Sequence, residues 1–104
     1  YSGAQMFYSP NNPESAQLAE CIRESVVSSL QPDNTRQNKE AGEEIYLLTH
    51  CQVPAVLVEC GFLSNPEEAN LLSQEAYQQD MAAAIYNGIV SFLEQREAES
   101  SSSR

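Results

Sequence analysis

The chain has 104 residues, with fifteen acidic and five basic side chains and a formal net charge of -10. This length suits one compact unit with a modest core and leaves no room for a second domain. The negative charge argues against binding to nucleic-acid phosphates or to anionic membrane surfaces. No apolar run approaches the roughly 20 residues that cross a bilayer, so we expect a soluble chain with no membrane insertion.

The two ends of the sequence carry different signals. The chain starts at Tyr1 without an initiator Met, and it shows neither the basic start nor the apolar stretch of a signal peptide. We therefore expect the native polypeptide to begin upstream, with any export signal there. Residues 96–104 are polar and Ser-rich without an apolar period, which predicts a disordered tail.

The first part of the chain predicts a strand followed by a helix. Residues 3–9 mix apolar and aromatic side chains and then meet a Pro/Asn turn at residues 10–13. Asn12 is a suitable helix cap, with Pro13 at the first helical position. An apolar residue at every fourth position predicts one buried stripe on this helix, made of Leu18, Ile22, Val26 and Leu30.

A polar connection follows the first helix. Residues 31–42 are unusually basic for this chain, since they contain Arg36 and Lys39, and they predict a solvated loop. The apolar residues 45–48 favour a short strand or a turn edge, although four residues are too few to separate strand from helix by period.

The clearest signal is the apolar, β-branched run of residues 54–59, which closes in Glu59. Such a run predicts a strand that is buried on both faces of an α/β sheet. Asn65 then provides a cap, with Pro66 at the first helical position and two glutamates near the positive end of the helix. We expect this short helix to run through about Leu72.

A longer helix is predicted from a cap at Ser73 towards Gln95. Apolar residues recur at three and four residue spacing, which is typical of a core face rather than of a cofactor site. The predicted face consists of Tyr77, Met81, Ile85, Ile89 and Phe92 or Leu93, with the small residues Ala82, Ala83, Ala84 and Gly88 allowing close packing.

Glu59 is the main candidate for chemistry. In open α/β sheets, sites gather at the carboxyl ends of strands, and Glu59 lies at such an end before a Gly-containing turn. A carboxylate that is partly desolvated there suits a general acid or base. A structural carboxylate that caps nearby amides is the alternative interpretation.

Cysteine and histidine chemistry is weaker in this sequence. The three cysteines have no CxxC spacing and there is one histidine, which predicts free thiols and no zinc site built by this chain alone. A Cys51–Cys60 disulfide stays an alternative. His50 and Cys60 as a catalytic pair would lack a third, orienting residue.

Residues 54–68, with the sequence PAVLVECGFLSNPEE, closely resemble the last motif of the zinc-dependent N-acetylmuramoyl-L-alanine amidases of type 3. The similarity covers nearly all of residues 1–93. It includes residues 2–5 with Phe7 and Tyr8, Leu18 and Ala19, Arg36 and Lys39, and Tyr77 with residues 84–89. We therefore expect residues 1–95 to be the carboxyl-terminal half of an amidase catalytic domain. The implied fold is a three-layer α/β/α arrangement with a mostly parallel sheet, of which only the later strands and helices are present in this chain.

The resemblance also implies a function, that of a peptidoglycan hydrolase. In that family, zinc held by two histidines and a glutamate activates the water that cleaves the amide between N-acetylmuramic acid and L-alanine of the stem peptide. Glu59 matches the family's general acid/base residue. Because the family's metal ligands precede the matched region, zinc is implied for the complete enzyme, and none is expected to bind this chain alone.

Several further expectations follow from the resemblance. Arg36 and Lys39 would bind carboxylates of the stem peptide, with a plain solvated loop as the alternative. The enzyme would be secreted or located in the cell wall, with a role in sporulation as one option. The uncovered edge of a half sheet would allow self-association. The competing function is a catalytically incomplete, amidase-like module that binds cell wall or a protein partner.

Overall fold

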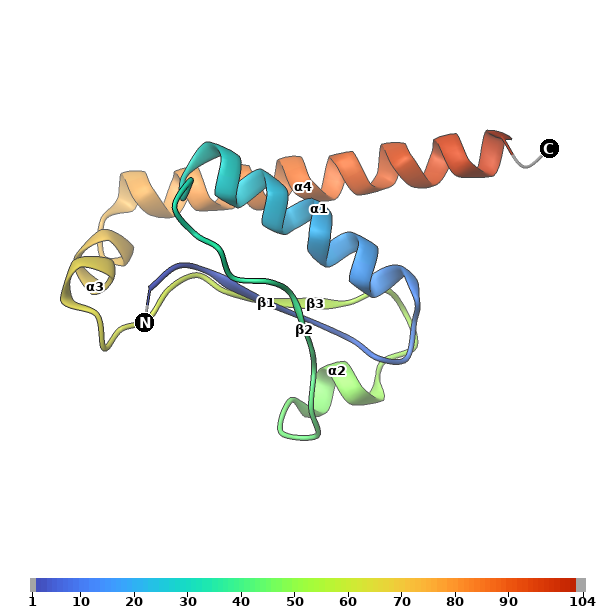
Figure 1. Cartoon of the computed structure of the whole chain (residues 1–104), viewed down its shortest axis with the longest axis horizontal. Helices are drawn as coiled ribbons and strands as arrows, with labels where there is room; N and C mark the ends of the chain where they lie inside the picture. The colour runs from blue at the N-terminus through green and yellow to red at the C-terminus, as the bar shows by residue number, and fades with distance from the viewer. Residues whose placement is uncertain (1, 103–104) are drawn as a thin grey trace.

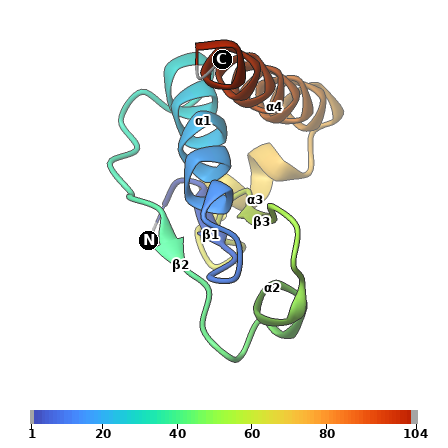
Figure 2. The ribbon, with the colours of Figure 1, turned by 90° about the vertical axis from the view of Figure 1, so that its right-hand side faces the viewer.

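The structure is a computed structural model, and it describes residues 2–102. The elements in chain order are β1 (Gln5–Tyr8), α1 (Glu14–Ser29), β2 (Lys39–Glu40), α2 (Tyr46–His50), β3 (Val56–Glu59), α3 (Pro66–Leu72) and α4 (Glu75–Ser102). Helices α1 and α4 lie side by side on one face of a small sheet, and α2 lies on the other side of the strands (Figures 1 and 2). The predicted α/β class is confirmed.

The sheet has the strand order β2-β1-β3 and is mixed. Strand β1 runs parallel to β2, with Phe7 opposite Lys39, and antiparallel to β3, with Gln5 opposite Glu59. The predicted loop therefore contains a short strand, β2, whose pairing continues where the amide of Ala41 donates to the carbonyl of Tyr8 at 2.9 Å. Two residues are too short a run to show a strand period in the sequence.

The two faces of the sheet differ, because side chains alternate along a strand. Ala4, Met6, Val56 and Val58 pack into the core beneath the helices. The opposite face is more open, and Leu57 on β3 is 41% exposed. The prediction that β3 is buried on both faces is thus wrong for this chain, because α1 and α4 cover the same face.

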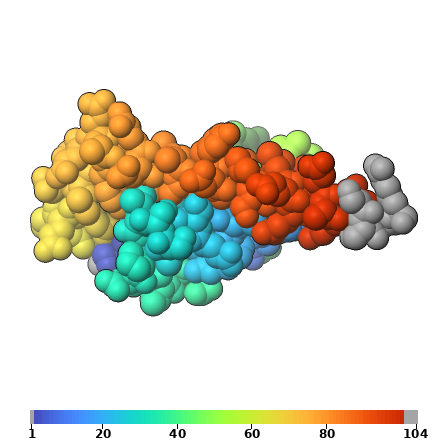
Figure 3. Space-filling model, turned by 90° about the horizontal axis from the view of Figure 1, so that it is seen from above, coloured from blue at the N-terminus to red at the C-terminus, as the bar shows by residue number. Residues whose placement is uncertain are grey.

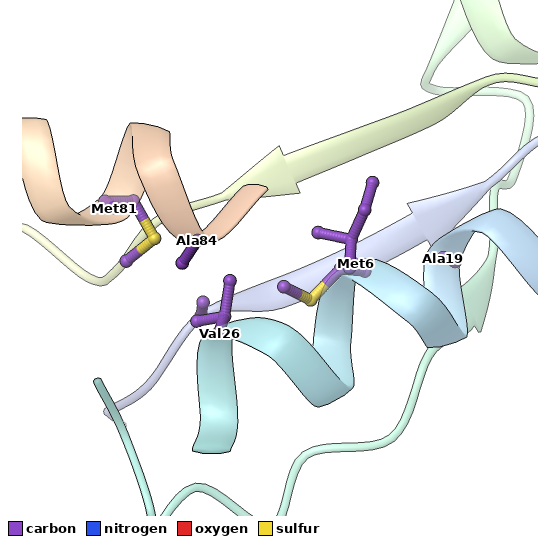
Figure 4. Close-up of a cluster of buried hydrophobic side chains, with 7 residues drawn as sticks. Met6, Ala19, Val26, Met81 and Ala84 are labelled. Carbon is purple, nitrogen blue, oxygen red and sulfur yellow. The ribbon is translucent and has the colours of Figure 1, made fainter. Parts of the chain in front are cut away.

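The core forms where β1, α1 and α4 meet. Figure 4 shows Met6 of β1 close to Val26 of α1 and to Met81 and Ala84 of α4. The predicted stripe of α1 is confirmed, since Ile22 and Val26 are buried and Leu18 and Leu30 pack partly buried against them.

The buried face of α4 is narrower than predicted. Met81 and Phe92 are buried as expected, and so are Ala84 and Gly88. Ile89 and Leu93 are 38% and 50% exposed, and Ala82 and Ala83 are also exposed. Figure 3 shows α4 lying along α1. A single neighbouring helix covers only one stripe of the surface of α4, so the other side chains of α4 stay exposed.

The beginning of α3 is capped as predicted, and that of α1 differs by one residue. Helix α1 begins at Glu14 with Pro13 at the cap position, and the side-chain oxygen of Asn12 accepts a hydrogen bond from the amide of Glu14 at 2.9 Å. Asn65 accepts from the amides of Glu67 and Glu68 at 3.0 and 3.2 Å. The predicted cap at Ser73 is wrong, because its hydroxyl donates to the carbonyl of Asn70 and α4 begins at Glu75.

Two other segments also differ from the sequence-based expectation. Residues 45–48 contribute to helix α2 rather than to a strand, since the amides of Leu48 and Thr49 both donate to the carbonyl of Ile45. Helix α4 continues to Ser102, so residues 96–102 are helical where a disordered tail was predicted. An ion pair of 3.1 Å from Arg96 to Glu14 ties this part to α1, while residues 103–104 lie outside the described residues.

Replacing the Asn65 cap should destabilise the turn between β3 and α3. We expect Asn65→Ala to lower the free energy of unfolding by about 1 kcal/mol, because two amides of α3 lose their acceptor. Denaturant unfolding of the 104-residue chain measures this loss. Asn70→Ala, an exposed change later in the same helix, is the matched control and should have no such effect; equal losses in both variants would contradict the capping role.

Candidate functional site

Glu59 ends β3 on the face of the sheet opposite α1 and α4. It lies opposite Gln5 of β1, and it borders a pocket of about 240 Å³ that is lined by Gln5, Phe7, Arg36, Lys39, Glu59 and Phe62. The structure thus brings together the three residues that the sequence singled out, from two distant parts of the chain. Glu59 is exposed, so the desolvation expected for its carboxylate is not found.

Arg36 is held at the wall of this pocket by several groups. Its Nε donates to the carbonyl of Ser2 at 2.8 Å, and Nη1 donates to the side-chain oxygen of Gln5 at 3.3 Å. Its guanidinium also lies 4.5 Å from the centre of the Phe62 ring, a cation–π contact. Arg36 therefore links the segment before β1 to the turn that follows Glu59.

Glu68 of α3 fixes the same turn from the other side. Its carboxylate accepts from the amide of Gly3 at 3.0 and 3.1 Å and from the amide of Phe62 at 3.2 Å. Sequence reasoning placed Glu68 only at the positive end of a helix and did not find this clamp. The sequence gives no signal for it, since its bonds join residues that are 65 and 6 positions apart.

Lys39 differs from Arg36 in its surroundings. It is exposed on β2, in register with Phe7, and its ammonium forms no ion pair with any of residues 2–102. The pocket thus has one cation that is engaged by protein groups and one whose charge is open to a ligand.

The cysteines do not form a second reactive site. Cys21, Cys51 and Cys60 are free, which confirms the expectation of thiols and leaves no Cys51–Cys60 disulfide. Burial raises the pKa of the Cys60 thiol and so disfavours its nucleophilic thiolate. His50 is exposed on α2, where its ring stacks on Tyr46.

The residues described here do not fit a zinc site. Among residues 2–102, no group of three or more His, Cys, Asp or Glu side chains is placed to hold a metal ion. Zinc in proteins is usually held by three or four such ligands, so this part of the chain does not supply a set. In the same range, no helix is long and apolar enough to cross a membrane.

The scaffold is a small mixed α/β sheet with an acidic side chain at the end of a strand. A family model described as N-acetylmuramoyl-L-alanine amidase matches residues 1–91, and the chain belongs to this family.

Individual relatives agree with this assignment. The germination-specific N-acetylmuramoyl-L-alanine amidase of Bacillus subtilis is 36% identical over 96 residues, which are 92% of this chain and 40% of that protein. The CwlD amidase of Clostridioides difficile, solved in complex with the GerS lipoprotein, is 44% identical with a TM-score of 0.86, over 90% of this chain and 47% of that one. The amidase AmiC2 of Nostoc punctiforme is 28% identical with a TM-score of 0.79, over 89% and 49%. The chain therefore spans between 40% and 49% of the length of these relatives.

Proposed function

We propose that residues 1–95 are the carboxyl-terminal half of a catalytic domain that cleaves peptidoglycan at the amide between N-acetylmuramic acid and L-alanine. The observation that carries the proposal is the pocket in which Glu59, at the end of β3, meets Arg36 and Lys39. The match of the amidase family model over residues 1–91 supports it. The enzyme would act outside the cell or in the cell wall, where its substrate lies.

Glu59 is the proposed general acid/base. Its exposed carboxylate borders the pocket, so a water and an amide can both reach it. It would take a proton from the attacking water and then give one to the nitrogen of the leaving L-alanine, which departs as an amine. The clamps through Arg36 and Glu68 would hold the turn after Glu59, because proton transfer requires hydrogen-bond distances.

The residues that hold the metal would belong to the remainder of the complete domain. The zinc implied by the family would polarise the reacting groups when it is bound, and its ligands would lie outside the residues described here. Of the two basic residues that line the pocket with Glu59, Lys39 is proposed to bind the substrate, because Ser2, Gln5 and Phe62 already engage the guanidinium of Arg36. The outer edge of β3, which has no partner strand among residues 2–102, would be covered by the remainder of the domain or by self-association.

The proposal is tested by adding the missing half. The chain would be joined to the part of the Clostridioides difficile amidase that it does not match, and zinc content and release of new L-alanine amino termini from purified peptidoglycan would be measured. We expect the joined protein to bind zinc and release L-alanine termini, while the 104-residue chain does neither. A folded joined protein that binds zinc and peptidoglycan without releasing any termini would instead support the binding-module alternative.

A further inference from the structure

We propose that Lys39 anchors a free carboxylate on the second residue of the stem peptide, so that the pocket selects stems whose carboxylate is not amidated. This inference rests on the proposed amidase function and adds to it a basis for choosing among substrates. It also assigns different roles to the two cations of the pocket. Lys39 distinguishes a carboxylate from a neutral amide, and Arg36 positions the turn after Glu59.

The sheet register places Lys39 at a suitable distance from Glu59. Lys39 lies opposite Phe7, and Phe7 lies opposite Leu57 of β3. Two strand spacings of about 4.8 Å each therefore separate the backbone of Lys39 from that of Leu57 by about 10 Å. Glu59 lies two residues, about 7 Å, further along β3, so the backbones of Lys39 and Glu59 are about 12 Å apart. Two extended residues span up to about 7 Å, and the flexible Lys39 side chain covers the remaining distance. A peptide cut at Glu59 can thus present the carboxylate of its second residue to Lys39.

The surroundings of the two cations decide which of them is open to a ligand. The guanidinium of Arg36 donates to Ser2 and Gln5 and lies against the Phe62 ring, so a ligand anion would compete with contacts that hold the fold. The Lys39 ammonium has no ion pair within residues 2–102 and borders the pocket. In a chain with a net charge of -10, such a cation is a specific place for an anion to bind.

Two small substrates test the inference on the joined protein. In N-acetylmuramoyl-L-alanyl-γ-D-glutamyl-L-lysine the α-carboxylate of the second residue is free and its γ-carboxyl is bonded to the third residue, and the D-isoglutaminyl form carries an amide in place of that α-carboxylate. We expect kcat/KM to favour the free acid by about five- to tenfold, as for a partly exposed charge-assisted hydrogen bond. Lys39→Ala should bring the ratio close to one, whereas Lys39→Arg should keep it. Glu40→Gln changes the charge of the neighbouring, exposed residue and should leave the ratio unchanged.

Arg36→Ala gives the contrasting result. It should lower kcat for both substrates alike and leave their ratio unchanged, because its effect acts through the turn rather than through the carboxylate. A wild-type ratio near one, or a ratio that survives Lys39→Ala, would overturn the inference. Calorimetry on the joined protein with Glu59→Gln, which should bind both compounds without cleaving them, measures the ratio of the two dissociation constants. Absence of cleavage by the unsubstituted protein thus contradicts the proposed function, while the binding ratio still decides the role of Lys39.

Discussion

Glu59→Gln should lower the rate of amide cleavage by roughly 10²- to 10⁴-fold in the joined protein, with zinc content and thermal stability unchanged. The amide has nearly the same shape as the carboxylate, but it neither accepts a proton from water nor returns one to the leaving amine. Since Glu59 is exposed at the end of β3, the substitution leaves no buried group without a partner. Release of L-alanine amino termini from peptidoglycan measures the rate.

A second acidic residue provides the matched control for this prediction. Glu67 is also exposed, lies in the first turn of α3, and is outside the pocket that contains Glu59. Glu67→Gln changes the net charge by the same amount and should leave cleavage unchanged. If Glu59→Gln retained wild-type cleavage, or lost it together with its zinc, the assignment of Glu59 as the general acid/base would be wrong.

Local signals in the sequence predicted the elements around the site well. The apolar run before Glu59, the cap at Asn65 and the four-residue stripe of α1 all depend on neighbours in the chain, and the structure has each of them. The pocket, in contrast, depends on the pairing register of the strands. That Gln5 lies opposite Glu59 and Lys39 opposite Phe7 follows from pairing between segments about 30 to 55 residues apart, which no local pattern specifies.

The predictions that failed also depended on contacts between distant segments of the chain. The run at residues 54–59 has the composition of a strand buried on both faces, yet Leu57 is exposed because both long helices lie on the other face of the sheet. Likewise, the outer residues of α4 have apolar side chains at helical spacing, but one neighbouring helix covers only part of them. The composition of a segment indicates which side chains would be stable when buried, and tertiary contacts decide which of them are buried.

Gly88→Ala should destabilise the chain, although alanine is the better helix former. The added Cβ would lie 2.6 Å from the Cα of Ile22 and 2.9 Å from the carbonyl oxygen of Cys21, both of which are backbone atoms of α1. The gain in helix propensity is about 1 kcal/mol, but α1 must move away from α4 to accommodate the methyl group. We expect a net loss of about 2 kcal/mol in the free energy of unfolding and a fall in Tm of roughly 10 °C.

A control at the neighbouring residue distinguishes the effect of close helix packing on stability from the effect of helix propensity. Asn87 is exposed in the same turn of α4, so Asn87→Ala gains propensity without approaching α1 and should leave Tm unchanged or raise it slightly. Shortening the facing side chain with Ile22→Ala should not rescue Gly88→Ala, because the clash is with the Cα of Ile22 and not with its side chain. Thermal unfolding of Gly88→Ala, Asn87→Ala, Ile22→Ala and the double variant with Ile22→Ala and Gly88→Ala measures both effects. A Gly88→Ala chain as stable as wild type would show that α1 and α4 lie further apart than the close approach at Gly88 requires.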